Sequence, residues 1–266
     1  MNIVITGTSS GIGQALAGHF VAAGNEVWGL ARRPQQGTGR FRTAICDVSD
    51  RGSIERVARE ITDRCSYIDG LVCCAGLQGA IGPTMTLSPE DWAATVRANL
   101  EGTLFTIRAF HAAIVRCPRR AKIVCFSGGG AATPRPNFSA YAVAKAAIVR
   151  LVETLAAEWR ELPVDINVVA PGAINTAMTE QIIRAGAGGA GEKEFAAAKK
   201  QHETGGQSLE KVVGLVGFLL SPQSDGLSGK FISAQWDDWR NFGPRRGELM
   251  KSDVYTLRRI TEDKKP

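Results

Sequence analysis

Short apolar runs alternate with longer helical patterns along the whole chain. The apolar runs lack the polar alternation of a half-exposed strand, as residues 71–74 (Leu-Val-Cys-Cys) and 123–126 (Ile-Val-Cys-Phe) show. Unbroken runs of this kind are typical of strands that helices cover on both faces. They predict strands at 2–6, 26–31, 42–46, 69–74, 121–126, 164–170 and 230–234, with helices at 11–23, 50–64, 88–116, 137–162, 175–185 and 208–220. The pattern predicts an α/β fold: one domain with a doubly wound parallel sheet.

Two segments depart from this alternation. Residues 186–191 (Gly-Ala-Gly-Gly-Ala-Gly) contain too much glycine for a stable helix, and we expect a flexible hinge or loop there. Residues 235–266 follow the last predicted strand as a tail that contains Trp236, Trp239 and Tyr255. We expect the end of this tail, residues 262–266, to be disordered.

Composition narrows the class of protein. The 266 residues, 44% of them apolar, are enough for one large domain with a substantial core. The net charge of +6 comes from separated pairs such as Arg119-Arg120 rather than from a basic stripe with interleaved aromatic residues, which argues against a nucleic-acid partner. No apolar stretch approaches the roughly 20 residues of a membrane helix, and the first strand opens the chain without a signal peptide. We therefore expect a soluble, cytoplasmic protein with no membrane partner.

The cysteines and histidines give no sign of a metal site. Six cysteines show neither a CxxC pair nor metal-ligand spacing, and the three histidines stand alone. Cys46, Cys73, Cys74 and Cys125 lie in or at the ends of predicted buried strands. We expect reduced thiols in the core and no bound metal.

Three glycines follow the first predicted strand and open the first predicted helix. Gly7, Gly11 and Gly13 permit a tight turn and the close approach of a pyrophosphate, which the N–H groups and partial positive charge of a helix N-terminus would bind. A glycine triplet also occurs in ordinary strand-helix turns. Its place directly after the first strand favours nucleotide binding.

The end of the second predicted strand indicates which nucleotide. An acidic residue there would bind a ribose 2′-hydroxyl, but the chain reads Leu-Ala-Arg32-Arg33. Guanidinium groups match a 2′-phosphate by paired, charge-assisted hydrogen bonds. The sequence therefore predicts NADP(H) in preference to NAD(H), unless both arginines are merely solvated. Asp47, at the end of the third strand, either accepts from an adenine amino group or caps the next helix, or does both.

Tyr141 and Lys145 are four residues apart, so they lie on one face of the predicted helix about one turn from each other. An ammonium close to a phenol favours the phenolate and lowers its pKa. A tunable acid of this kind, downstream of a phosphate-binding turn, indicates hydride transfer coupled to proton transfer.

Taken together, these motifs make the chain resemble the classical short-chain dehydrogenase/reductases over residues 1–234. The motifs that match, in chain order, are Thr6-Gly7-x3-Gly11-Ile12-Gly13, Asp47-Val48, Cys74-Ala75-Gly76, Asn99, Tyr141-x3-Lys145 and Pro171-Gly172 with Thr176. The resemblance implies a Rossmann fold in which residues 1–234 bind a dinucleotide and carry the catalytic residues. Residues 235–266 would be a C-terminal extension that covers the substrate cleft or an interface, or is simply a packing segment.

The resemblance also implies roles for individual residues. Tyr141 would exchange a proton with the substrate oxygen, Lys145 would lower the pKa of Tyr141 and hold the nicotinamide ribose, and Asn99 would support a water relay to Lys145. The residues expected to bind the cofactor are Gly7, Ser9, Ser10, Gly11, Ile12, Gly13, Arg32, Arg33, Asp47, Val48, Ala75, Gly76, Tyr141, Lys145, Pro171, Gly172, Ile174 and Thr176.

The chain departs from the family pattern at three places. Cys74 replaces an asparagine, and the Asp-Gly-Gly that usually follows the last strand is absent. The catalytic serine of the family lies thirteen residues before the tyrosine, where this chain has Gly128. A loop longer by one residue would bring Ser127 to that position, and this is the expectation. In the alternative, Ser139 or a backbone N–H of residues 128–130 polarises the substrate carbonyl.

The function expected from these residues is reversible, NADP(H)-dependent interconversion of a ketone or aldehyde and an alcohol. The substrate is a small molecule, possible examples being a sugar, an aminocyclitol or another polyol. The resemblance implies a homodimer or homotetramer. Two other functions stay open: a non-catalytic NADP-binding sensor or scaffold, and a nucleotide-sugar epimerase or dehydratase.

Overall fold

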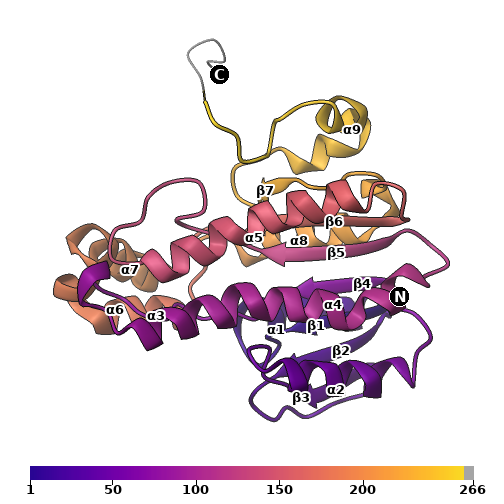
Figure 1. Ribbon diagram of the computed structural model, residues 1–266, viewed down its shortest axis with the longest axis horizontal. Coiled ribbons are helices and arrows are strands. Elements are labelled where there is room, and N and C mark those ends of the chain that lie inside the picture. Colours follow the sequence, from indigo (N-terminus) through magenta and orange to yellow (C-terminus); the bar gives the residue numbers. More distant parts are fainter. Residues whose placement is uncertain (261–266) are drawn as a thin grey trace.

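Seven parallel strands form one sheet in the computed structural model, which describes residues 1–260 (Figure 1). Their order across the sheet is β3-β2-β1-β4-β5-β6-β7. The strands are β1 (Asn2–Thr6), β2 (Glu26–Ala31), β3 (Phe41–Ile45), β4 (Gly70–Cys73), β5 (Ala121–Phe126), β6 (Val164–Ala170) and β7 (Phe231–Ser233). The strand order reverses at the neighbouring strands β1 and β4, and in open α/β sheets ligands bind at the carboxyl ends of the strands at such a point. The predicted doubly wound parallel sheet is confirmed.

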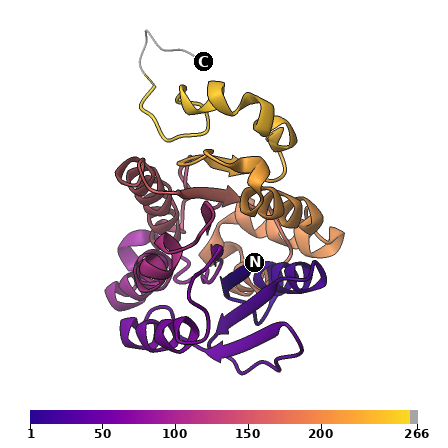
Figure 2. The ribbon, with the colours of Figure 1, turned by 90° about the vertical axis from the view of Figure 1, so that its right-hand side faces the viewer.

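Helices cover both faces of this sheet, as the view in Figure 2 shows. They are α1 (Gly11–Ala22), α2 (Arg51–Thr62), α3 (Pro89–Val96), α4 (Gly102–Val115), α5 (Ser139–Glu158), α6 (Ala177–Ala190), α7 (Glu192–Thr204), α8 (Leu209–Leu220) and α9 (Phe242–Met250). One core joins the sheet to α2, α4 and α5 through buried side chains such as Ile54, Phe110 and Ile148. The other core joins it to α1 and α8 through Leu16 and Leu215. Burial on both faces explains why the inner strands read as unbroken apolar runs, whereas the edge strand β3 is only partly buried.

The single helix expected over residues 88–116 is interrupted. Residues Arg97–Glu101 form a π-helical turn between α3 and α4. Such turns occur inside α-helices and are frequent at functional sites. Asn99 lies within this turn and is completely buried.

The loop expected at residues 186–191 is largely helical, so that expectation is wrong. Gly186 adopts a left-handed conformation (φ 66°) that kinks α6, and the helix continues to Ala190. Helix α7, which the sequence analysis did not predict, follows directly. Ala190 and Ala198 are buried against Phe138, and this tertiary contact outweighs the low helix propensity of the glycines.

The tail after β7 packs along the free edge of the sheet. Trp239 and Phe242 join the core beside α8, and the Phe231 amide donates to the Tyr255 carbonyl at 2.8 Å. The Lys230 ammonium donates to two further tail carbonyls. The tail thus satisfies backbone groups that the edge strand β7 would otherwise expose. Helix α9 of the tail lies on the side of the molecule away from α6 and α7 (Figure 1). The predicted disorder of residues 262–266 lies outside the described residues.

Within residues 1–260, every helix is too short or too polar to cross a lipid bilayer.

Candidate active site

Helix α5 brings Tyr141 and Lys145 together next to the carboxyl end of β5. Both side chains are buried, with only 8% of Tyr141 and 5% of Lys145 exposed. The Lys145 Nζ lies 5.4 Å from the centre of the Tyr141 ring, and it donates a hydrogen bond to the Phe126 carbonyl at 3.1 Å. The spacing of four residues therefore produces the predicted pair, and β5 fixes the position of the amine.

Burial dominates the electrostatics of this pair. It raises the pKa of the Tyr141 phenol, and the guanidinium of Arg135 acts in the opposite direction. Burial also lowers the pKa of Lys145 to about 8, opposed by the thiols of Cys74 and Cys125. Desolvation therefore disfavours the Tyr141 phenolate more than the guanidinium of Arg135 favours it. That Lys145 lowers the pKa of Tyr141 stays a prediction.

Asn99 and Gly76 complete the surroundings of Lys145. A side chain at Gly76 would begin 2.7 Å from Asn99 Oδ1 and 3.5 Å from Lys145 Nζ, so only glycine fits between them. The Asn99 Nδ2 donates to the carbonyls of Leu77 (2.9 Å) and Thr95 (3.0 Å). The Asn99 oxygen accepts from the Leu77 amide at 3.4 Å, so the buried side chain ties the loop after β4 to the π turn.

Ser127 and Gly128 follow β5 and face different partners. The Ser127 hydroxyl, on a side chain that is almost fully buried, donates to the Lys145 backbone carbonyl at 2.9 Å. The side-chain position that faces Tyr141 is that of Gly128, where a Cβ would lie 3.4 Å from the phenol oxygen. Ser127 therefore binds the backbone of α5, and the residue that faces the phenol is Gly128. The other candidate hydroxyl, that of Ser139, accepts a hydrogen bond from Trp92 of α3.

The glycine turn after β1 fits a pyrophosphate. Gly7 is left-handed (φ 81°), and a Cβ there would lie 2.9 Å from the Ala75 backbone; a Cβ at Gly13 would overlap the Gly7 carbonyl. Ser10 precedes α1 without capping it by its side chain, and the first turn of α1 contains no acidic residue. The first amides of α1 are therefore available to an anion.

The second expected part of the cofactor site lies beside this turn. Arg33 is exposed, and its guanidinium donates to the Ser9 hydroxyl at 3.1 Å and 3.3 Å and to the Ser9 carbonyl at 3.3 Å. Arg32 is exposed as well. Asp47 accepts from the amide and hydroxyl of Ser49, whereas the cap of α2 is Asp50. The helix-capping alternative for Asp47 is therefore wrong.

The segment after β6, residues 171–176, borders the glycine turn. Pro171 and Gly172 lead into Thr176, which caps α6, and Thr176 lies against Gly11, since a Cβ on that glycine would be 3.3 Å from its methyl group. Ile174 is buried and pairs with Gly206. The glycine turn and the segment 171–176 thus come together through the contact of Gly11 with Thr176.

Several residues that hold the site were missed by the sequence analysis. Gln235, in place of the usual Asp-Gly-Gly, donates to the carbonyls of Pro171 and Ser208 at 2.9 Å. Gln207 accepts from the Ala173 amide at 2.8 Å. Arg135 forms an ion pair with Glu194 of α7 at 2.8 Å. None of these residues carries a local motif, because each acts across elements that are distant in sequence.

Comparisons with known proteins agree with this geometry. The sequence pattern of the family described as "short chain dehydrogenase" matches residues 1–186. The chain is 35% identical to 2,3-dihydro-2,3-dihydroxybenzoate dehydrogenase of Escherichia coli over 181 residues, which are 66% of this chain and 71% of the relative. It is 29% identical to D-threitol dehydrogenase of Mycolicibacterium smegmatis, over 65% of this chain and 70% of that one.

A solved structure has the same fold over almost the whole chain. The ligand-free aldohexose dehydrogenase of Thermoplasma acidophilum superposes with a TM-score of 0.77 at 23% identity and covers 97% of both chains. Among residues 1–260, no group of three or more histidine, cysteine or acidic residues could hold a metal ion.

Proposed function

The chain belongs to the short chain dehydrogenase family, and on that premise we propose that it is an NADP(H)-dependent oxidoreductase that interconverts a ketone or aldehyde and an alcohol. The observation that carries this proposal is the buried cluster of Tyr141, Lys145 and Asn99 beside the glycine turn. When bound, the nicotinamide would supply or accept the hydride. The turn and the segment 171–176 would hold it.

Tyr141 would carry the proton of the reaction. In the reducing direction its hydroxyl donates to the substrate oxygen, and in the oxidising direction its oxygen accepts that proton. Its raised pKa keeps the phenol protonated near neutrality, which suits the donor role. Lys145, whose pKa lies near 8, is close enough to neutrality to exchange protons during turnover. Asn99 holds the loop after β4 by its hydrogen bond to the Leu77 carbonyl, and Gly76 of this loop lies next to the Lys145 amine.

Arg33 supports the preference for NADP(H). Its guanidinium already lies against Ser9 of the glycine turn, where the 2′-phosphate of the cofactor would provide a stronger, charged acceptor. A hydrogen bond to a charged group contributes about 1.5–3 kcal/mol. We expect Arg33→Gln to raise the KM for NADPH by about 10–100-fold and to leave the KM for NADH nearly unchanged.

The substrate proposed is a small polar molecule with more than one oxygen. The relatives named above act on a dihydroxylated ring acid and on D-threitol, as their names state. In this chain a charged pair lies near Tyr141: the Arg135 guanidinium is 5.7 Å from the centre of its ring and forms an ion pair with Glu194 of α7. A sugar, an aminocyclitol or another polyol fits this chemistry.

A direct test is a screen for consumption of NADPH and NADH with diacetyl, ketoses, aldoses and, in the oxidising direction, polyols. We expect turnover with NADPH, and a loss of about 10²–10⁴-fold in Tyr141→Phe, which removes the proton donor and keeps the ring. Cofactor binding, followed by fluorescence quenching, should survive this substitution. Wild-type turnover in Tyr141→Phe would refute the mechanism. Cofactor binding without turnover on any substrate would favour a non-catalytic sensor.

A further inference from the structure

The position that faces the phenol of Tyr141 carries no side chain. A Cβ at Gly128 would lie 3.4 Å from the Tyr141 oxygen, and glycine leaves that space open. The neighbouring hydroxyl of Ser127 has a single proton, which it donates to the Lys145 carbonyl. Ser127 cannot keep this hydrogen bond and also donate to a substrate oxygen. A second donor for that oxygen must come from elsewhere.

Three consecutive backbone amides lie at this place. Gly128 and Gly130 are half-buried and Gly129 is exposed, and none of the three N–H groups has a hydrogen-bond acceptor in the part of the chain that the structure describes. The turn is closed by the Ala131 amide, which donates to the Gly128 carbonyl at 3.1 Å. Unpaired amides gathered in a glycine turn form a concavity that binds negative charge.

The glycine turn is pressed against the helix that carries Tyr141. Gly130 is left-handed (φ 94°), and a Cβ there would lie 2.7 Å from the Cβ of Ala142, the residue after Tyr141. Only glycine allows this approach. The turn is therefore held in place by packing, and its amides are fixed in position relative to the phenol.

The distances are compatible with one oxygen shared between the turn and the phenol. Backbone bonds of about 1.5 Å place the Gly128 nitrogen within roughly 6 Å of the Tyr141 oxygen, given the 3.4 Å from the Cβ position. Two donors that share one acceptor oxygen, each about 2.8–2.9 Å from it, can lie nearly that far from each other. One substrate oxygen could therefore accept from the Gly128 amide and from the phenol.

We propose that the backbone amides of Gly128, Gly129 and Gly130, rather than a serine hydroxyl, bind the substrate oxygen opposite Tyr141. This inference rests on the proposed function. In the reducing direction the hydride adds to the carbonyl carbon, the π electron pair moves onto the oxygen, and the proton of Tyr141 forms the new O–H bond. The amides transfer no proton. They stabilise the negative charge that develops on the oxygen, the task of an oxyanion hole.

Ser127 becomes a positioning residue under this proposal. Its hydroxyl holds the turn of α5 at Lys145, whose carbonyl it contacts. Ser127→Ala should therefore lower kcat by only about fivefold, the worth of one neutral hydrogen bond. A serine that polarised the substrate would cost about 10²–10³-fold when removed, as an oxyanion donor does.

The test compares proline with alanine at Gly129, because proline deletes the N–H and alanine keeps it. A Cβ at this residue meets nothing closer than 3.9 Å, and the preceding glycine tolerates the restriction that proline imposes on its neighbour. With NADPH and diacetyl, we expect Gly129→Pro to lose at least about tenfold in kcat relative to Gly129→Ala. Equal kcat in the two variants, or a loss in Ser127→Ala as large as that in Tyr141→Phe, would overturn the proposal.

A binding measurement covers the case in which the proline variant does not fold. In protein labelled with [¹⁵N]glycine, assigned by single Gly→Ala variants, saturating NADP and diacetyl should shift the amide resonances of Gly128–Gly130, also in Tyr141→Phe. Resonances that stay unchanged would overturn the proposal. Failure of the proposed function is a separate result, since it would appear as full turnover in Tyr141→Phe.

Discussion

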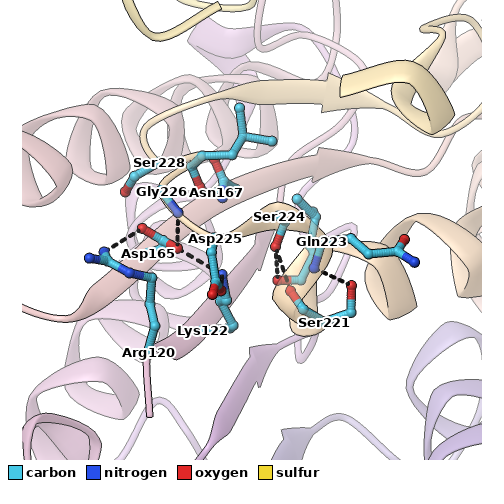
Figure 3. Close-up of polar contacts among 12 residues, drawn as sticks. Arg120, Lys122, Asp165, Asn167, Ser221, Gln223, Ser224, Asp225, Gly226 and Ser228 are labelled. Carbon is cyan, nitrogen blue, oxygen red and sulfur yellow. Dashed lines mark hydrogen bonds and ion pairs between the residues drawn. The ribbon is translucent and has the colours of Figure 1, made fainter. Parts of the chain in front are cut away.

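Two buried lysines, Lys122 on strand β5 and Lys145 on helix α5, lie near opposite ends of that strand and have opposite surroundings. Lys122, at the amino end, is 4% exposed and contacts two carboxylates, those of Asp165 and Asp225, each at 2.7 Å. Figure 3 shows that the Arg120 guanidinium and the Gly226 amide both donate hydrogen bonds to the same Asp165 carboxylate. Lys122 and Asp165, the two buried charges of this cluster, are therefore paired with each other and with further partners, as the burial of ions requires.

Lys145, near the carboxyl end of the same strand, is equally buried and has no such partner. Within residues 1–260 no carboxylate lies within ion-pair distance of its amine, which donates only to the Phe126 carbonyl. Its pKa falls to about 8 because burial disfavours the charge. The difference indicates that the amino end of the sheet is arranged for stability, whereas the carboxyl end retains an uncompensated charge that chemistry can use.

The largest expected effect separates activity from stability at Lys145. Lys145→Met keeps the volume and removes the amine, so we expect kcat to fall by about 10²–10⁴-fold, the cost of losing a group that moves the proton. The free energy of unfolding should not decrease, because the substitution also removes a desolvated charge. Steady-state kinetics and urea unfolding measure the two quantities. A stability loss of several kcal/mol would show that this lysine is structural, like Lys122.

The converse is expected at the other end of β5. Asp165→Asn leaves Lys122 buried with only the half-exposed Asp225, so the free energy of unfolding should fall by about 3–5 kcal/mol. Turnover of the folded variant should stay near the wild-type value, because Asp165 lies far from Tyr141 along the strands. Arg120→Gln is the matched control: its guanidinium is 37% exposed, and its removal should cost about 1 kcal/mol or less. Equal losses in the two variants would contradict the comparison.

The lowered pKa of Lys145 predicts how stability depends on pH. The folded value of about 8 lies below the ordinary value of 10.5, so between these two pH values the unfolded chain binds more protons than the folded one. Stability due to this group therefore rises as the pH increases through that window, and it is at its lowest below pH 8. Relative to Lys145→Met, the wild type should gain about 3 kcal/mol across the window. A difference that stays constant with pH would contradict the shifted pKa.

The same two ends show what the sequence could and could not predict. Apolar runs and their alternation with helical patterns predicted all seven strands, and the glycine turn and the Tyr141–Lys145 spacing predicted the candidate site, because these signals are local. The Lys122–Asp165 pair was not predicted, since it depends on the register between β5 and β6. The expectation for Ser127 depended on an assumed longer loop, whereas a simple count of thirteen residues back from Tyr141 reaches Gly128, the position that faces the phenol. The actual partner of Ser127, the Lys145 carbonyl, was not predicted.

Tertiary contacts explain the remaining failures. The π turn around Asn99 lies between two helices that follow each other without a loop, so the sequence pattern predicted one helix. Helix α7 and the end of α6 depend on packing against Phe138, which composition does not encode. Arg135, which acts on the pKa of Tyr141, is a lone charged residue in a loop, and its role follows only from its stacking on Phe138.

The smallest expected effect concerns Arg135, a cation near the carboxyl end of the sheet that, unlike Lys145, has a carboxylate partner, Glu194. Arg135 opposes the burial that raises the pKa of Tyr141, and it pairs with Glu194. Arg135→Gln should raise the pKa of Tyr141 further, whereas Glu194→Gln keeps the guanidinium and should not raise it. Ultraviolet titration of the phenolate, with Tyr141→Phe subtracted to remove Tyr67 and Tyr255, measures the shift. If both variants raised the pKa equally, the ion pair would act by positioning the loop rather than by charge, and the carboxyl end would resemble the amino end more closely than the two lysines indicate.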